Sequence, residues 1–223
     1  LRPLPYANAD RLVSLSSPVP KLQGQSVWGL ARHEMFYFLE RGRSLENLGV
    51  YSTFQPTVAG DGSNQASERV RAVQTSASLF QVLGFTPLHG RLLRIEENSQ
   101  RPPTTAVLGH DFWTRRFGSD PDVIGRALNI EGMSLEIVGV LPPGATLPDE
   151  QVDLWLPAHV DSTVVMNNHT WAAIGLLRAG YTAEDAMREL APLTARLPEV
   201  FSNVYGAKFI ENTGFSTEVV SLR

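Results

Sequence analysis

Five histidines are the side chains of this sequence best suited to acid–base or metal chemistry. They are His33, His89, His110, His159 and His169. No two of them stand three or four residues apart, so no helix presents the paired imidazoles of a metal site. His110 and the adjacent Asp111 could form a base and its orienting carboxylate, but neighbours at a helix start face different directions. Asp111 is explained as a partner of the helix dipole.

Neighbouring carboxylates are the second source of chemistry. Glu96 and Glu97 could work as an acid–base pair, but consecutive carboxylates in a polar loop are expected to be solvated. Asp149, Glu150 and Asp153 form a loose acidic cluster that could bind a hard cation such as calcium. Their spacing matches no known calcium loop, and a solvated turn is the favoured interpretation.

Glycine-rich and nucleophile motifs point away from catalysis. The turn at Ala59-Gly60-Asp61-Gly62 precedes an expected strand rather than a helix, so it is not a phosphate-binding loop. The chain has no Gly-x-Ser-x-Gly elbow and no cysteine, hence no thiolate nucleophile. We predict that the protein is not an enzyme and carries no catalytic, cofactor or metal site; a hydrolase is the least favoured alternative.

Two groups of aromatic and arginine side chains are candidates for partner contact. Trp113, Arg115 and Arg116 could form an exposed cation–π patch. The alternative is that Trp113 and Phe117, four residues apart, form the buried stripe of a short helix while both arginines face water.

The second group lies on the first long helix expected from the sequence. Its apolar residues cover more than one face, which packing on one side does not require. Trp28, Phe36 and Tyr37 are therefore candidates for partner contact on this helix.

Composition narrows the class of protein. The 223 residues carry a net charge of −4, and Lys21 and Lys208 are the only lysines, so no basic stripe for nucleic acid exists. No apolar run reaches the roughly 18 residues of a membrane helix. The opening Leu1-Arg2-Pro3-Leu4-Pro5-Tyr6 is typical of the interior of a protein, so we expect a piece of a longer chain.

Hydrophobic periodicity and turn residues predict the elements that must position these groups. Helices are expected at 27–40, capped by Ser26, at 79–83, at 110–117 and from the N-cap Thr182 onward. Strands are expected at 12–16, 45–54, 68–75, 104–108, 125–130, 135–140, 153–157, 171–177 and 215–222. Turns at 59–64 and at Glu131-Gly132 predict two hairpins.

These elements predict an α+β fold with two lobes. Both chain ends, 1–75 and 169–223, form a porter-like split β-α-β lobe, and a β-rich α/β lobe, 76–168, is inserted between them. The two ends of the chain then lie together on one lobe, as attachment to two neighbouring membrane helices would require. We expect a hinge near Ser76 and Asn168, where the insert leaves and rejoins.

A series of motifs in order along the chain resembles the MacB-like periplasmic core domain of ABC-transporter permeases, most closely the permease group abundant in acidobacteria. The matching segments are Leu1-Arg2-Pro3-Leu4-Pro5-Tyr6, Asp10-Arg11-Leu12-Val13, Leu79-Phe80-Gln81-Val82-Leu83-Gly84-Phe85, Gly90-Arg91, Val107-Leu108-Gly109-His110-Asp111-Phe112-Trp113, Arg115-Arg116-Phe117-Gly118, Asp120-Pro121, Ile124-Gly125-Arg126, Ile137-Val138-Gly139-Val140-Leu141-Pro142-Pro143-Gly144, Asp153-Leu154-Trp155-Leu156-Pro157 and Leu177-Arg178-Ala179-Gly180-Tyr181-Thr182.

The resemblance implies a periplasmic domain of an inner-membrane permease with a non-catalytic role in transport or efflux. Its partners would be the membrane helices of the same permease, a cytoplasmic ATP-binding subunit or domain that acts through them, and a second permease copy in a dimer. A periplasmic module that binds a small ligand or a partner protein is the alternative function, and it requires convergent polar groups in a deep pocket.

Overall fold

A computed structural model describes residues 6–24, 27–60, 66–161, 163 and 165–222. The chain divides into two compact units, which are described separately. Unit 1 contains the described residues of Ala7–Val50 and of Val160 onward. Unit 2 contains Tyr6 and the described residues of Tyr51–His159. The predicted lobe boundaries, 76–168 for the insert, stay a prediction.

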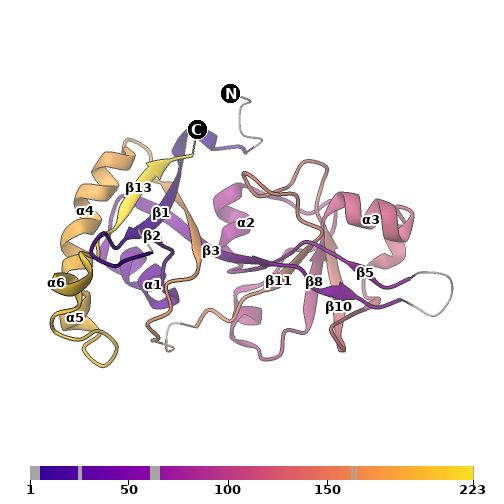
Figure 1. Cartoon of the computed structure of the whole chain (residues 1–223). Coiled ribbons are helices and arrows are strands. Elements are labelled where there is room, and N and C mark those ends of the chain that lie inside the picture. Colours follow the sequence, from indigo (N-terminus) through magenta and orange to yellow (C-terminus); the bar gives the residue numbers. More distant parts are fainter. Residues whose placement is uncertain (1–5, 25–26, 61–65, 162, 164, 223) are drawn as a thin grey trace. The chain divides into compact units, whose positions relative to one another are not determined.

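Unit 1 pairs the first and last described strands of the chain (Figure 1). Its sheet has the order β13-β1-β12-β3, and a short β2 also pairs with β1. Numbered by their place in the chain, these four main strands run 4-1-3-2, which is the order of a split β-α-β fold. The strands are β1 (Leu12–Pro18), β2 (Val27–Trp28), β3 (Leu45–Phe54), β12 (Ala172–Leu177) and β13 (Glu218–Ser221).

Among its described residues, unit 1 has four α-helices, and the longest of them runs along the last strand. They are α1 (Arg32–Arg41), α4 (Ala183–Ala195), α5 (Leu197–Val200) and α6 (Phe209–Thr213). Helix α4 contacts both β13 and α1 (Figure 1). Its N-cap Thr182 accepts the Asp185 N–H, and Asp185 accepts the Thr182 N–H in return. The capping residues expected from the sequence therefore start this helix where predicted.

Unit 2 is a mixed sheet with the order β3-β6-β11-β8-β10-β9-β4-β5, to which β7 adds beside β10. Strand β10 is parallel to β8 and β11 is parallel to β6, while the other pairs are antiparallel. The strands are β4 (Thr57–Val58), β5 (Glu68–Arg69), β6 (Ala72–Thr75), β7 (His89–Gly90), β8 (Thr105–Leu108), β9 (Ala127–Ile130), β10 (Met133–Val140) and β11 (Leu154–Pro157).

Helices α2 (Ser78–Leu83) and α3 (His110–Phe117) complete unit 2, with single 3-10 turns at Ile95–Ser99 and Pro121–Val123. Each helix ends at a glycine in the left-handed region, Gly84 at φ 70° and Gly118 at φ 60°. Phe112 and Trp113 of α3 pack into an apolar core with the inward faces of β8, β9 and β10. The predicted α+β class is confirmed.

The first predicted helix, 27–40, is wrong at its start. Val27–Trp28 forms β2, and the helix begins only at Arg32. The reason is tertiary: Gly29 donates its N–H to the His169 carbonyl at 2.9 Å, and Leu30 donates to the Trp171 carbonyl at 2.8 Å. These bonds hold the segment extended despite its helical periodicity. The predicted cap Ser26 lies outside the described residues.

The predicted strand 68–75 is also interrupted. It divides into β5 and β6, because the Val70 N–H turns to the Pro56 carbonyl and the Arg71 carbonyl accepts from the chain before β11. The second hairpin forms as predicted, with Glu131 at φ 49° and Gly132 at φ 81° between β9 and β10. Positive φ at both turn positions matches the twist of the flanking strands.

Candidate functional site

Four polar side chains meet inside unit 1. His33 and Glu34 come from the start of α1, His169 precedes β12 and Tyr205 follows α5. We call them the His–Tyr cluster. The Tyr205 hydroxyl lies 3.0 Å from His33 Nε2 and 3.2 Å from His169 Nε2, and it donates to Glu34 Oε1 at 3.4 Å. Glu34 is fully buried and the other three are nearly so.

Local chemistry explains how a carboxylate comes to lie here. Glu34 is in the first turn of α1, where its Oε2 accepts the Ala31 N–H at 2.8 Å. A negative charge at this position complements the helix dipole. His169 Nδ1 lies 3.5 Å from the same oxygen. The backbone bond between Gly29 and His169 keeps the histidine close to the helix start.

Burial controls the protonation of the His–Tyr cluster. It lowers the pKa of His33 below its usual 6.5, and His169 adds to this effect while Glu34 opposes it. Burial and the neighbouring Glu34 raise the pKa of Tyr205, so the phenol stays protonated. Neither His33 Nδ1 nor His169 Nδ1 has a hydrogen-bond partner among the described residues. The cluster is thus buried among its own hydrogen-bonding groups, and its His169 also lines a hollow.

A hollow of about 800 Å³ lies beside the His–Tyr cluster. Its wall is Trp28, whose ring stacks on His169 with centroids 5.4 Å apart. The lining residues are Gly24, Val27, Trp28, Gly29, Asn167, Asn168, His169 and Thr170.

Phe36 and Tyr37, which were predicted to contact a partner together with Trp28, lie on α1. Phe36 is half-buried, whereas Tyr37 is buried and donates its hydroxyl to the Leu193 carbonyl at 3.4 Å. The three aromatic residues therefore do not form one surface stripe, and partner contact through them stays a prediction.

In unit 2 the structure separates the two arginines of α3. Arg116 is buried with Trp113, and its guanidinium donates to Glu68 Oε1 at 3.0 Å and to the Ala59 carbonyl at 2.6 Å. Arg115 is exposed and lies 3.4 Å from both Glu68 Oε2 and Asp153 Oδ1. Arg116 therefore anchors the β4–β5 hairpin, and Arg115 is the arginine that presents charge at the surface.

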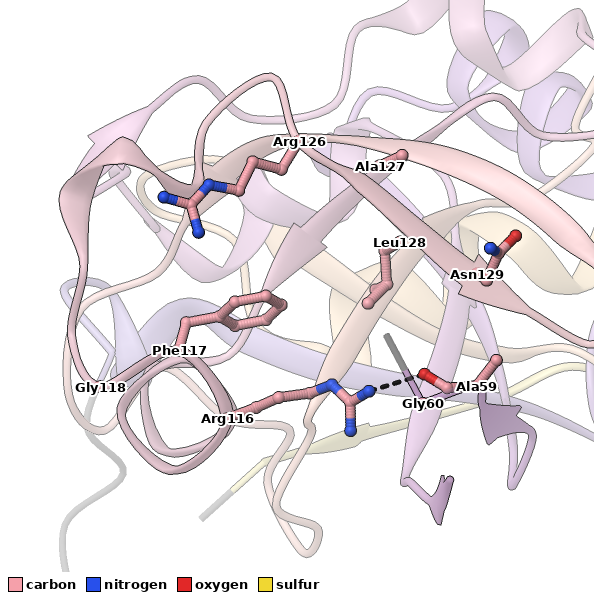
Figure 2. Close-up of a pocket in the computed structure, with 9 residues that line it drawn as sticks. All are labelled: Ala59, Gly60, Arg116, Phe117, Gly118, Arg126, Ala127, Leu128 and Asn129. Carbon is pink, nitrogen blue, oxygen red and sulfur yellow. Dashed lines mark hydrogen bonds between the residues drawn. The ribbon is translucent and has the colours of Figure 1, made fainter. Parts of the chain in front are cut away.

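A pocket of about 600 Å³ opens beside this arginine network. Figure 2 shows the guanidinium groups of Arg116 and Arg126, the Phe117 ring and the Leu128 side chain around it. The other lining residues are Ala59, Gly60, Gly118, Ala127 and Asn129. Arg126 also pairs with Asp120 at 2.6 Å.

The remaining carboxylate candidates have structural partners. Glu97 is buried, so its expected solvation is wrong: it binds Arg91 through both oxygens at 2.9 and 3.1 Å and accepts the Arg94 N–H. Burial acts to raise the pKa of Glu97, but these bonds outweigh it and the pKa is lowered. Asp153 is buried against Arg71 and Arg115. His110 and the exposed Asp111 approach to 3.5 Å.

Metal centres and membrane spans are both missing from the part of the chain that the structure describes. In that part, no group of three or more histidine, aspartate and glutamate side chains could hold a metal ion. No helix within the described ranges has the length and apolarity needed to cross a membrane.

Comparison with known proteins decides the family. The family described as the MacB-like periplasmic core domain matches residues 13–193. The chain belongs to this family. A search of the curated proteins found no match.

Two solved structures share the fold of this chain. The MacB-like domain resembles the periplasmic region of MacB from Actinobacillus actinomycetemcomitans, with a TM-score of 0.65 and 12% identity over 96% of this chain and 90% of that one. It also resembles the extracellular domain of the noncanonic ABC-type transporter YknZ from Gram-positive bacteria, with a TM-score of 0.63 and 10% identity over 94% and 99%. The predicted family and its α+β fold are confirmed.

The His–Tyr cluster was missed by sequence reasoning. The residues that meet at Tyr205 are separated from it by up to 172 positions, so no local spacing signals them. In a MacB-like domain, as in any chain, an isolated histidine or glutamate is expected at the surface. The helix-start position of Glu34 was the available signal, because an acidic residue there often bonds the backbone at the helix N-terminus.

Proposed function

We propose that this MacB-like domain is the periplasmic part of an ABC-transporter permease in the inner membrane, and that it is non-catalytic. In this proposal the domain converts ATP hydrolysis, performed by a cytoplasmic partner, into movement during transport or efflux. The observation that carries the proposal is the family match over residues 13–193. The pairing of β1 with β13 supports it, because force applied at both ends of the chain then acts on neighbouring strands.

The buried polar groups support a non-catalytic role. The imidazoles and phenol of the His–Tyr cluster lie inside unit 1, and the buried carboxylates of unit 2 bind arginines or backbone. A catalytic base must reach the proton that it removes, and His33, Glu34 and Tyr205 are too deeply buried to do so. We infer that they hold the two units rigid, so that motion is concentrated between the units. The lobes expected from the sequence, 1–75 with 169–223 and 76–168, and their hinge near Ser76 and Asn168 stay predictions.

The test replaces the domain in the parent permease, reconstituted in vesicles with its ATP-binding partner, by a flexible glycine–serine linker. We expect ATP hydrolysis to persist and vectorial transport to be lost. The matched control carries Tyr181→Phe, a change at an exposed side chain, and should transport normally. Full transport without the domain, or ATP hydrolysis by the isolated domain, would contradict the proposal.

A second candidate, a small-ligand module, is favoured by the hollow beside the His–Tyr cluster. Trp28 offers an aromatic wall, and Asn167, Asn168 and Thr170 offer polar groups, a combination that suits a small amphipathic ligand. Titration of the domain with a library of small amphipathic compounds, monitored by tryptophan fluorescence, tests this function. Saturable changes that Trp28→Phe abolishes would favour it, and their absence would reject it.

A further inference from the structure

The first imidazole of the His–Tyr cluster, His33, is a fixed hydrogen-bond donor. A neutral imidazole carries one proton, on Nδ1 or on Nε2. His33 Nδ1 is buried and has no acceptor within the described part of the chain, so a proton there would be left unpaired. We therefore assign the proton to Nε2, which lies 3.0 Å from the Tyr205 oxygen and donates to it. Burial lowers the pKa of His33, which keeps this ring neutral.

The second imidazole, His169, faces an acceptor on each side. Its Nδ1 lies 3.5 Å from Glu34 Oε2, which is an electrostatic contact rather than a full hydrogen bond. Its Nε2 lies 3.2 Å from the Tyr205 oxygen. With its proton on Nδ1, neutral His169 presents that proton to the carboxylate and accepts the Tyr205 hydroxyl at Nε2. The contacts then run in one direction, from His33 at one end to Glu34 at the other.

This arrangement leaves one place for a further proton. If the Tyr205 hydroxyl turns to Glu34 Oε1, 3.4 Å away, its second lone pair can accept from a protonated His169 Nε2. Every proton of the cluster then faces an acceptor, and Oε1 gains the one donor that the described residues offer it. A second proton on His33 would sit on Nδ1 and have no acceptor. The geometry thus directs the first added proton to His169.

The surroundings of the cluster are aromatic. Rings from β2, from the end of α5, from α6 and from the chain before β13 contact its imidazoles; they are Trp28, Phe201, Phe209 and Phe215. The cations next to the cluster in sequence are directed elsewhere, because Arg32 of α1 lies over the Trp171 ring and Lys208 before α6 is exposed. Among the described residues, no titratable or charged side chain outside the cluster forms a hydrogen bond or an ion pair with it. The groups that decide where a proton is held are therefore its own members.

We propose that the His–Tyr cluster is a switch that responds to pH by binding one proton. On acidification, a proton from solvent adds to His169 Nε2, and the Tyr205 hydroxyl turns to Glu34. The resulting ion pair between His169 and Glu34 joins the chain before β12 to the first turn of α1. The Gly29 N–H, which donates to the His169 carbonyl, already joins the same two segments. The added charge should tighten this connection, because a hydrogen bond between charged groups is stronger than one between neutral groups.

The switch is independent of the proposed transport role, and the 223-residue chain is sufficient to test it. Long-range proton–nitrogen NMR spectra of the histidine side chains, recorded from pH 8 to pH 5, locate the protons directly. At pH 8 we expect opposite tautomers, with the proton of His33 on Nε2 and that of His169 on Nδ1. As the pH falls, His169 should gain a proton on Nε2 while His33 stays neutral. The protection factor of the Gly29 amide, which corrects for the intrinsic effect of pH on exchange, should rise at least about twofold over the same range.

Two variants identify the groups that make the switch. Tyr205→Phe removes the hydroxyl that turns, so a proton on His169 Nε2 would lack an acceptor and should bind at least about fivefold more weakly. Glu34→Gln removes the negative charge and should abolish the rise in Gly29 protection. Tyr181→Phe, a change at an exposed side chain, is the matched control and should behave like the wild type. Thermal melts at pH 8 establish that each variant is folded; if the cluster variants unfold, the wild-type tautomers and Gly29 protection still decide the question.

Three outcomes would overturn the proposal. The first is any pair of tautomers at pH 8 other than the one expected, because the hydroxyl would then have no second position to take. The second is protonation of His33 before His169. The third is protonation of His169 with unchanged protection of the Gly29 amide, because the proton would then be bound without tightening the two segments.

Discussion

Removing the hydroxyl of Tyr205 is the sharpest perturbation of unit 1. Tyr205→Phe keeps the ring and its packing against Phe209, whose centroid is 4.7 Å away, and takes away one oxygen. That oxygen has one proton to donate and lone pairs to accept, and it lies within 3.4 Å of three buried groups. The substitution therefore tests hydrogen bonding with little change in volume.

The expected loss follows from the number of bonds. The hydroxyl makes two contacts with imidazoles, at 3.0 and 3.2 Å, and a longer one with a carboxylate at 3.4 Å. Each hydrogen bond contributes roughly 1 kcal/mol, and a buried group left without its partner costs about 1–3 kcal/mol. Because His33 and His169 are both buried, we expect a loss of about 2–4 kcal/mol in the free energy of unfolding.

Urea denaturation at pH 7.5, followed by circular dichroism, measures this loss. Tyr181→Phe is the matched control, since its side chain is 41% exposed, and its free energy of unfolding should stay within about 0.5 kcal/mol of the wild type. A Tyr205→Phe protein as stable as the control would refute the reasoning, because the cluster would then not depend on the hydroxyl.

Three further predictions concern pH, backbone crowding and a buried amide. Burial lowers the pKa of His33 in the folded protein, so on acidification the unfolded state binds the proton first, and the stability that neutral His33 contributes falls as the pH drops below about 6.5. In urea denaturation, the difference in free energy of unfolding between wild type and His33→Leu should therefore shrink between pH 7.5 and pH 5.5. A difference that stays constant over this range would contradict the prediction. Gly139→Ala places a Cβ against the Arg91 carbonyl and should cost about 1–3 kcal/mol in a thermal melt, whereas the unobstructed Gly206→Ala should be neutral; equal melting temperatures would reject the close approach. Asn98→Ala removes three hydrogen bonds to backbone groups and should lower the free energy of unfolding, measured by urea denaturation, by about 2–4 kcal/mol. A loss below about 1 kcal/mol would contradict this prediction.

Local signals in the sequence predicted the elements that end in special backbone conformations. Helix α3 begins and ends at the predicted residues. Its end was predictable because Gly118 supplies the left-handed position that stops the helix. The β9–β10 hairpin was predictable because Glu131-Gly132 suits a two-residue turn. In both cases the information lies within a few residues.

Distant partners account for what the sequence did not reveal. Val27–Trp28 has helical periodicity, but its strand conformation depends on β1 and on the chain around His169. Arg116 was expected to face water in one interpretation, but the Ala59 carbonyl, 57 positions away, accepts its guanidinium. Glu97 is different, because Arg91 stands only six positions before it. The sequence does not show that the loop between them brings the two side chains together.

The central claim, that ATP hydrolysis moves this domain, is tested most directly by a distance measurement in the parent permease. The domain has no cysteine, so spin labels can be placed at Arg188→Cys in unit 1 and Asp111→Cys in unit 2, both exposed positions. A pair within unit 2, Asp111→Cys with Ile95→Cys, serves as the control. Pulsed electron paramagnetic resonance should show a shift in the first distance when ATP is bound and hydrolysed, while the control distance stays constant. If the first distance is unchanged while the permease hydrolyses ATP and transports, the domain does not carry the motion.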